Sequence, residues 1–208
     1  ETVKTGDYVK RFQLIGESQG NISAKIHSPV SGNVKDIIEK AMPNGANVKT
    51  VVIENDFQYI EEETVKREIR NLSSYSEKEL LEIIENAGIT GEGGAQFPAH
   101  IKYDVKDKRI KNLILNGAEC EPYLTCDYTL MKEYTRELFD GIKIICEILK
   151  PENIILAIDE KYSALESEFQ KYNTDNVKIL TVSDIYPQGS EQLLINSILN
   201  KEIPKLKL

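Results

Sequence analysis

The spacing of hydrophobic residues changes along the chain and separates two regions. Residues 1–56 carry short apolar runs divided by Gly, Pro, Asn and Asp, a pattern typical of strands in a small sandwich or barrel. We expect strands at residues 8–10, 13–15, 24–27, 32–37 and 48–53. The pattern therefore predicts a small all-β module at the start of the chain.

Residues 76–208 alternate between helical and extended patterns. Ser76 and Glu79 are spaced as a capping box, which predicts the start of a helix, and an apolar stripe indicates a long helix from Asp127 to Lys150. We expect strands at residues 112–115, 153–159 and 177–182, and further helices at residues 162–172 and 190–199. Strands joined by helical crossovers run parallel. The predicted fold class is therefore α/β, with a parallel sheet flanked by helices.

A charged segment connects the two regions. It contains three consecutive glutamates, Glu61–Glu63, and a charge run of this kind is usually solvated. We therefore divide the chain into a β module at residues 1–56, a charged linker at residues 57–75 and an α/β domain at residues 76–208.

Composition limits the classes of function that fit this chain. Its 208 residues carry a net charge of −8 and are 40% hydrophobic, which is typical of a soluble globular protein. The negative balance argues against nucleic acid as a partner, because non-specific binding needs a basic face. No apolar run approaches the ~18 residues of a membrane helix, so we expect no transmembrane segment. Three cysteines, an odd number, fit a reducing compartment better than a disulfide framework.

The most distinctive stretch is GEGGAQFPAHIK at residues 91–102. Glycines allow a ligand to approach the backbone closely, and amides exposed next to a helix start form an anion site. Pro98 suits the first helical position, and Lys102 would lie one turn further along. We interpret the stretch as a phosphate cradle for a nucleotide-type cofactor, formed by Gly91, Gly93, Gly94 and Ala95. A glycine-rich surface turn before a short helix is the alternative.

Two loops that follow predicted strands combine glycine, carboxylates and amide or hydroxyl groups: residues 116–122 and residues 186–191. Ligands of an open α/β sheet bind outside the carboxyl ends of its strands. Carboxylates repel phosphate but accept hydrogen bonds from ribose or ribityl hydroxyls and from a nicotinamide amide. We therefore expect these loops to bind the polar organic part of the cofactor. Alternatively, Glu119, Glu121 and Glu191 are ordinary acids near helix N-termini.

Together, the glycine loop and these two loops resemble the C subunit of the Rnf electron-transport complex. That protein is similar in turn to the flavin-carrying, NADH-binding subunit of respiratory complex I. The start of the chain, with HSPVSG at residues 27–32, also resembles the Rnf protein and the barrel-sandwich hybrid of biotinyl and lipoyl domains. The resemblance implies FMN and NAD(H) as cofactors, other subunits of a membrane electron-transport complex as partners, and a peripheral location on the cytoplasmic face of the membrane.

The resemblance also assigns roles to residues. It implies that Asn116 contacts the flavin and that Glu119 and Glu121 lie near flavin and nicotinamide, where we expect the catalytic chemistry. The third loop would contribute Gly189 and Glu191. The glycine loop would bind the FMN phosphate with the help of the lysine at position 102.

The family's iron–sulfur clusters are expected only in a C-terminal region beyond this chain. Such clusters need several thiolates, and Cys120, Cys126 and Cys146 do not offer a four-cysteine site, so we expect no metal here. Two other interpretations stay open: a related flavin subunit of a soluble reductase, of the proline-reductase-associated type, and a docking module without cofactor. A redox pair formed by Cys120 and Cys126 is a further alternative.

Overall fold

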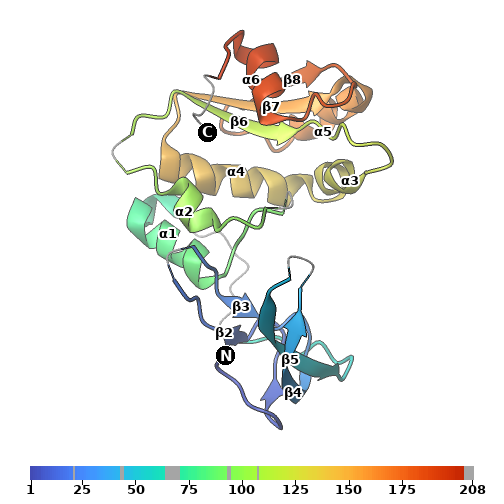
Figure 1. Cartoon of the computed structure of the whole chain (residues 1–208). Coiled ribbons are helices and arrows are strands. Elements are labelled where there is room, and N and C mark those ends of the chain that lie inside the picture. Colours follow the sequence, from blue (N-terminus) through green and yellow to red (C-terminus); the bar gives the residue numbers. More distant parts are fainter. Residues whose placement is uncertain (21, 43–44, 64–70, 93–94, 107, 204–208) are drawn as a thin grey trace. The chain divides into compact units, whose positions relative to one another are not determined.

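The computed structural model describes residues 1–20, 22–42, 45–63, 71–92, 95–106 and 108–203 (Figure 1). The chain forms two compact units, Glu1–Val105 and Lys106–Leu208. The domain boundaries predicted after residues 56 and 75 stay predictions, because a division into compact units does not decide where an independently folding domain begins. None of the helices in the described residues is long and apolar enough to cross a membrane.

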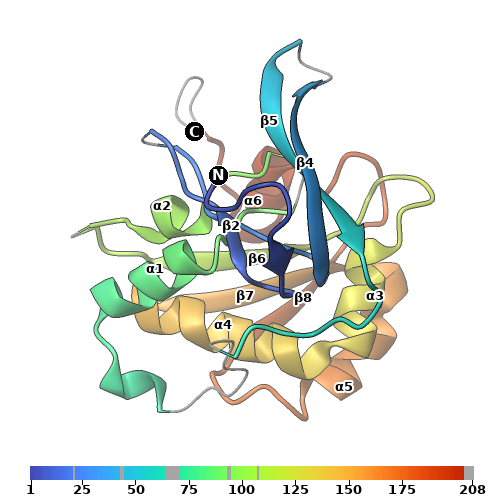
Figure 2. The same ribbon diagram turned by 90° about the horizontal axis from the view of Figure 1, so that it is seen from below.

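The first unit begins with two small antiparallel sheets. One has the strand order β1–β4–β5 and the other pairs β2 with β3. The strands are β1 (Tyr8–Val9), β2 (Leu14–Gly16), β3 (Ile26–His27), β4 (Gly32–Ala41) and β5 (Asn47–Asn55). Figures 1 and 2 show β4 and β5 side by side as a long hairpin. A small apolar cluster of Val3, Val9, Ile15 and Val34 forms the core of this part. The predicted all-β module is therefore present.

The start of the predicted linker pairs with this β module. The Arg11 amide donates to the Ile60 carbonyl at 2.8 Å, and the Glu62 amide donates to the Arg11 carbonyl at 2.9 Å. Backbone pairing of this kind holds residues 60–62 against the β module rather than leaving them as free chain.

Short helices complete the first unit: η1 (Leu72–Ser74), α1 (Glu77–Asn86) and α2 (Ala99–Tyr103). The predicted capping box is confirmed. The Ser76 hydroxyl accepts a hydrogen bond from the Glu79 amide, and the Glu79 carboxylate accepts one from the Ser76 amide at 2.7 Å. Pro98 was expected at the first helical position, but its ψ of 124° is extended, and it is the residue that precedes α2.

The second unit contains a parallel three-stranded sheet, as predicted. The strand order is β6–β7–β8, and β7 is the central strand. The strands are β6 (Asn112–Gly117), β7 (Asn153–Asp159) and β8 (Lys178–Val182). The helical elements are α3 (Cys126–Glu133), α4 (Thr135–Leu149), η2 (Glu160–Leu165), α5 (Glu166–Phe169) and α6 (Glu191–Leu199). The carboxyl ends of all three strands therefore meet at one edge of the sheet.

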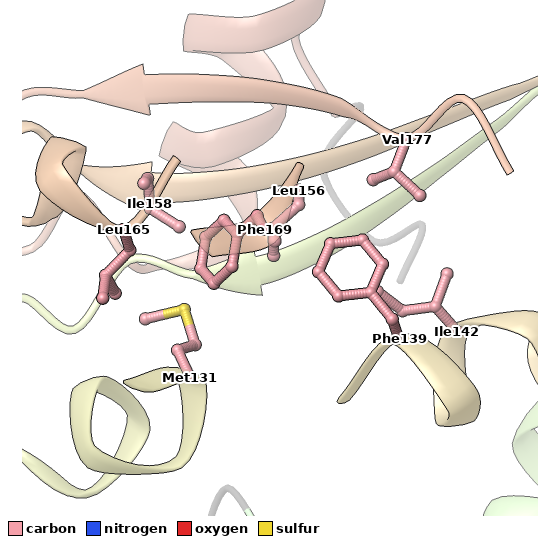
Figure 3. Close-up of a cluster of buried hydrophobic side chains, with 8 residues drawn as sticks. All are labelled: Met131, Phe139, Ile142, Leu156, Ile158, Leu165, Phe169 and Val177. Atoms are coloured by element: carbon pink, nitrogen blue, oxygen red, sulfur yellow. The ribbon is translucent and has the colours of Figure 1, made fainter. Parts of the chain in front are cut away.

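Alternate side chains of β7 pack on opposite faces of this sheet, as the pleat of a strand requires. Leu156 and Ile158 belong to the main core cluster, whose members from α3, α4 and α5 include Met131, Phe139 and Phe169 (Figure 3). Ala157 points the other way and packs with Leu194 of α6. Figure 1 accordingly shows α4 and α6 on opposite sides of the sheet. Both faces of the central strand are covered, which explains its nearly continuous apolar sequence.

Two predicted helices differ from the structure. The single helix expected from Asp127 to Lys150 is α3 followed by α4, because Tyr134 lies between them with φ −125° and ψ 37°. The Leu138 amide still donates to the Tyr134 carbonyl at 2.9 Å, so the interruption is local. The helix expected at residues 162–172 is a 3-10 segment, η2, followed by the four residues of α5. Apolar periodicity does not detect one non-helical residue or distinguish these two helix types.

Candidate functional site

The two loops predicted to bind the organic part of a cofactor meet at the carboxyl edge of the sheet. The Asn116 side chain, at the end of β6, donates from Nδ2 to the Gly189 carbonyl at 2.8 Å. The Gly189 amide in turn donates to the Cys120 sulfur at 3.1 Å. The loop after β6 and the loop before α6 are therefore joined by two hydrogen bonds, one donated from each loop.

Gly189 has to be a glycine for this contact to form. A Cβ at this position would lie 2.4 Å from the Ala118 carbonyl oxygen and 3.0 Å from the Cys120 sulfur. The Asn116 Oδ1 also accepts a hydrogen bond from the Ala118 amide at 3.1 Å. Asn116, which the resemblance assigned to the flavin, thus uses both ends of its side-chain amide to hold the two loops together.

The Glu119 carboxylate caps the N-terminus of helix α3. Only 5% of the residue is exposed, and its carboxylate accepts hydrogen bonds from the amides of Asp127 at 3.0 Å and Tyr128 at 3.2 Å. The Cys126 thiol donates to the same group at 3.2 Å. This is the helix N-terminal role that we considered as the alternative, and Glu119 rather than Asp127 supplies the capping carboxylate. A catalytic role for Glu119 stays a prediction.

Hydrogen bonding controls the ionisation of Glu119. Burial alone would raise its pKa, but the bonds from the Asp127 amide, the Cys126 thiol and the Tyr128 amide together hold the pKa below its usual value. The bond to Glu119 also raises the pKa of the Cys126 thiol. The atoms of Glu119, Cys126 and Asp127 that could bind a metal lie within 4.8 Å of one another. A carboxylate occupied by two backbone amides and a thiol kept protonated fit a helix start better than a metal site.

Glu121 and Glu191 are exposed. Glu191 is the first residue of α6, directly after Ser190, whose hydroxyl accepts a hydrogen bond from the Leu193 amide. An acid in this position is favoured by the helix dipole. Tyr186, in the same loop as Gly189, is 65% exposed. These side chains are accessible to a ligand at the edge of the sheet.

The glycine loop lies in the first unit. A bridge between Thr90 and Pro98 closes it, and the Gly91 amide donates to the Phe97 carbonyl at 2.9 Å. The Gly91 amide is therefore not available to an anion. Gly93 and Gly94, the centre of the predicted cradle, lie outside the described residues. Ala95, the remaining member of the cradle, and Lys102 are exposed.

Sequence analysis missed a group of charged residues at the same sheet edge. Asp159, the last residue of β7, has an exposed fraction of 0%, and neither oxygen accepts a hydrogen bond of ordinary geometry from a described residue. The Lys161 ammonium lies 3.4 Å from Asp159 Oδ2 and 2.6 Å from Asp184 Oδ1. Burial raises the pKa of Asp159, and Lys161 opposes this rise. The sequence signal for this pair is an acid at the end of an apolar strand, followed two residues later by a lysine. An acid in a buried strand is rarely left without a partner.

All three cysteines are free thiols. Cys120 accepts a hydrogen bond from the Gly189 amide, and Cys126 donates to Glu119. Each of these two sulfurs therefore has its own polar contact, so the structure gives no particular support to a redox pair.

The second unit also presents exposed hydrogen-bond acceptors near the carboxyl edge of the sheet. Exposed carboxylates at residues 121 and 191 can accept hydrogen bonds from ribityl hydroxyls, and the neighbouring aromatic ring of Tyr186 is exposed. Together, the parallel sheet, the joined loops at its carboxyl edge and the accompanying β module define an α/β protein with polar groups at the edge where ligands of open α/β sheets bind.

The chain belongs to the family described as the Nuo51 FMN-binding domain, whose model matches residues 84–208. Residues 1–58 match a second model, the RnfC barrel sandwich hybrid domain. The second match agrees with the resemblance of the β module to barrel-sandwich hybrids, and the first identifies the α/β part as a flavin-binding type.

Among curated proteins, the chain is similar to C subunits of ion-translocating complexes. It is 40% identical to the C subunit of the proton-translocating ferredoxin:NAD(+) oxidoreductase complex of Clostridium ljungdahlii, over 97% of this chain and 44% of that protein. It is 35% identical to the C subunit of the Na(+)-translocating ferredoxin:NAD(+) oxidoreductase complex of Acetobacterium woodii, over 97% of this chain and 46% of that protein. The chain thus spans less than half the length of these relatives.

Among solved structures, the chain resembles an NAD+-reducing [NiFe]-hydrogenase in the H2-reduced state. The TM-score is 0.54 at 23% sequence identity, covering 61% of this chain and 25% of that one. At this level of identity the likeness supports the fold alone.

Proposed function

We propose that this chain is the flavin-binding, NADH-reactive part of a C subunit in an Rnf-type ferredoxin:NAD oxidoreductase. The observation that carries the proposal is the match of residues 84–208 to an FMN-binding family. The similarity of nearly the whole chain to C subunits of ferredoxin:NAD(+) oxidoreductase complexes supports the choice of complex.

The proposal gives the residues at the sheet edge distinct roles. Glu121 and Glu191 accept hydrogen bonds from hydroxyl groups of the ligands, since their carboxylates are exposed. Asn116 and Gly189 hold the two loops at a set distance, and Glu119 keeps the start of α3 in place. FMN, when bound, would supply the chemistry of hydride acceptance and single-electron release, so no side-chain nucleophile would be needed.

The phosphate end of FMN is assigned to the glycine loop. Gly93 and Gly94 remain the proposed cradle, together with Ala95, and Lys102 supplies a positive charge that is exposed. Gly91 does not donate to the phosphate, because its amide is already hydrogen-bonded to the Phe97 carbonyl within the loop. It closes the loop instead.

The rest of the electron path belongs to the proposal as well. We propose that electrons pass from the flavin to iron–sulfur centres. These centres would lie in the part of the relatives' length that this chain does not cover. We also propose that the protein binds other subunits of a membrane complex and is peripheral on the cytoplasmic face of the membrane.

The test is the visible spectrum of the purified chain reconstituted with FMN, before and after NADH is added without oxygen. The proposal expects a yellow protein that retains FMN on gel filtration and bleaches when NADH is added. Free FMN with NADH, at the same concentrations, is the control for the uncatalysed reaction. A chain that elutes colourless, or whose flavin bleaches no faster than free FMN, would contradict the proposal and favour a docking module.

A further inference from the structure

A single ammonium group connects the three loops at the carboxyl edge of the sheet. Besides the buried Asp159 at the end of β7, the Lys161 Nζ contacts Asp184, which follows β8, at 2.6 Å. It also donates to the Glu119 carbonyl, which follows β6, at 3.4 Å. Lys161 itself lies in η2, directly after β7. One side chain is therefore bonded to the segments after all three strands, and we call this arrangement the Lys161 clamp.

The buried carboxylate holds the clamp in place. Asp159 is fully buried and has no hydrogen bond of ordinary geometry from a described residue, so Lys161 is its main source of compensation. A buried charge that loses its partner is strongly unfavourable. The ammonium is therefore confined to a small region, and Asp184 and the Glu119 carbonyl are positioned around it.

The clamp is connected to the proposed cofactor loops through one peptide segment. The Glu119 carbonyl accepts from Lys161, while the Glu119 carboxylate accepts from the start of α3. The next residue, Cys120, contacts the Gly189 amide, and Gly189 contacts Asn116. A shift of the Glu119 carbonyl would therefore be passed to both loops that the proposed function assigns to the flavin and its reductant.

We propose that Lys161 is a positioning residue for the cofactor edge. It fixes the loop after β6 relative to the loop after β8 without contacting the cofactor itself. This inference rests on the proposed function and extends it, because the predicted site does not include Asp159, Lys161 or Asp184, although all three lie within the residues that the family model matches. We therefore expect the loss of the clamp to change the affinity and the orientation of the cofactor even in a chain that remains folded.

The experiment compares variants of the full chain by FMN titration and by the visible circular dichroism of bound flavin at saturation, which reports flavin orientation. Replacement of Lys161 alone leaves Asp159 buried and unpaired, so the main variant is D159N/K161M, which removes both charges. We expect it to fold, to bind FMN about tenfold more weakly or worse, and to show an altered flavin dichroism. K171M, which removes the exposed ion pair with Glu168, is the matched control and should match the wild type in both measurements.

A second variant covers the case in which D159N/K161M does not fold. D184N removes the negative charge from the 2.6 Å contact with Lys161, at an exposed position, and leaves the buried pair intact. It should weaken FMN binding about threefold or more. If D159N/K161M folds, wild-type FMN affinity together with wild-type dichroism would overturn the clamp. If the double variant does not fold, the same result for D184N would overturn it. Failure of the wild-type chain itself to bind FMN would instead refute the proposed function.

Discussion

Single residues set the geometry of the sheet edge, and Gly189 is the clearest example. Its amide and carbonyl connect two loops, and the space beside its Cα is filled by the Ala118 carbonyl. Sequence analysis selected Gly189 for a cofactor role because of the family resemblance. The structure adds a steric reason: a carbonyl oxygen occupies the position that a side chain would need.

Replacing Gly189 with alanine should separate the two loops. A Cβ 2.4 Å from a backbone oxygen cannot be accommodated by a side-chain rotation, so the loop must move. We expect a loss of about 1–3 kcal/mol in the free energy of unfolding, as for other overpacked sites. Urea denaturation of G189A measures this loss, and FMN titration of the same protein shows whether the loops are needed for binding.

Gly141, in helix α4, provides the control. A Cβ there meets no atom within 4 Å, and a helical glycine is less favourable than alanine by roughly 0.5–1 kcal/mol. We therefore expect G141A to be slightly more stable than the wild type. Equal stability of G189A and the wild type would show that the loop contact is not needed.

Glu119 should contribute to stability in a pH-dependent way. Its carboxylate bonds two amides of α3, and its pKa is lower in the folded chain than in the unfolded chain. This stabilisation is fully present above the ordinary carboxyl pKa and is lost as pH falls through the lowered folded value. We expect E119Q to be about 1 kcal/mol less stable than the wild type at pH 7. The difference should shrink as pH falls to about 3.

The measurement is urea denaturation of both proteins across this pH range. E121Q is the matched control, since Glu121 is exposed in the same loop and should have little effect at any pH. A difference between E119Q and the wild type that grows towards acid pH would show that the sign of the pKa shift is wrong.

At the scale of elements, local patterns predicted most of the fold. Strands β6, β7 and β8 and helix α6 lie close to their predicted positions, because buried parallel strands carry apolar runs that end at turn residues. The break at Tyr134 was not predicted, because the apolar stripe continues through it. The extent of β4 was underestimated, because it continues beyond residue 37 to Ala41 with exposed side chains.

The capping box of α1 gives a prediction at this scale. S76A removes the hydroxyl that accepts the Glu79 amide and should cost about 1 kcal/mol of stability. The helix is short, so its first turn is a large part of its hydrogen bonding. Thermal unfolding followed by far-ultraviolet circular dichroism measures the effect. E77Q, in the same turn, should change stability by only a few tenths of a kcal/mol; an S76A variant as stable as E77Q would show that the box contributes little.

At the scale of the whole molecule, charge affects the encounter with the proposed substrate. The chain carries a net charge of −8, and NADH is also an anion. Repulsion should slow their association at low ionic strength, and salt screens such long-range effects. With FMN bound and NADH below saturation, we expect flavin reduction to become roughly twofold faster or more between about 0.01 M and 0.15 M salt.

Stopped-flow measurement of flavin bleaching tests this expectation. Measurements at saturating NADH are the control, because association no longer limits the rate there and salt should have little effect. A rate that falls with salt at low NADH would mean that local positive charge outweighs the net charge.

The sequence by itself determined the fold class, the capping box of α1 and the presence of two loops at the carboxyl edge of the sheet. These features depend on residues that are near one another in the chain, and apolar period, glycine and capping residues report them directly. Family resemblance added FMN and the identity of the relatives. The particular roles of the acids could not be obtained in this way, because an acid in a loop looks the same whether it contacts a ligand or a helix.

Only the tertiary structure decided those roles. Glu119 bonds the start of α3 because the loop after β6 turns back onto that helix. Lys161 reaches Asp184 and the Glu119 carbonyl because three parallel strands end at the same edge, although these residues are far apart in sequence. Contacts of this kind depend on strand order and register, which arise from packing both faces of β7 rather than from any local pattern.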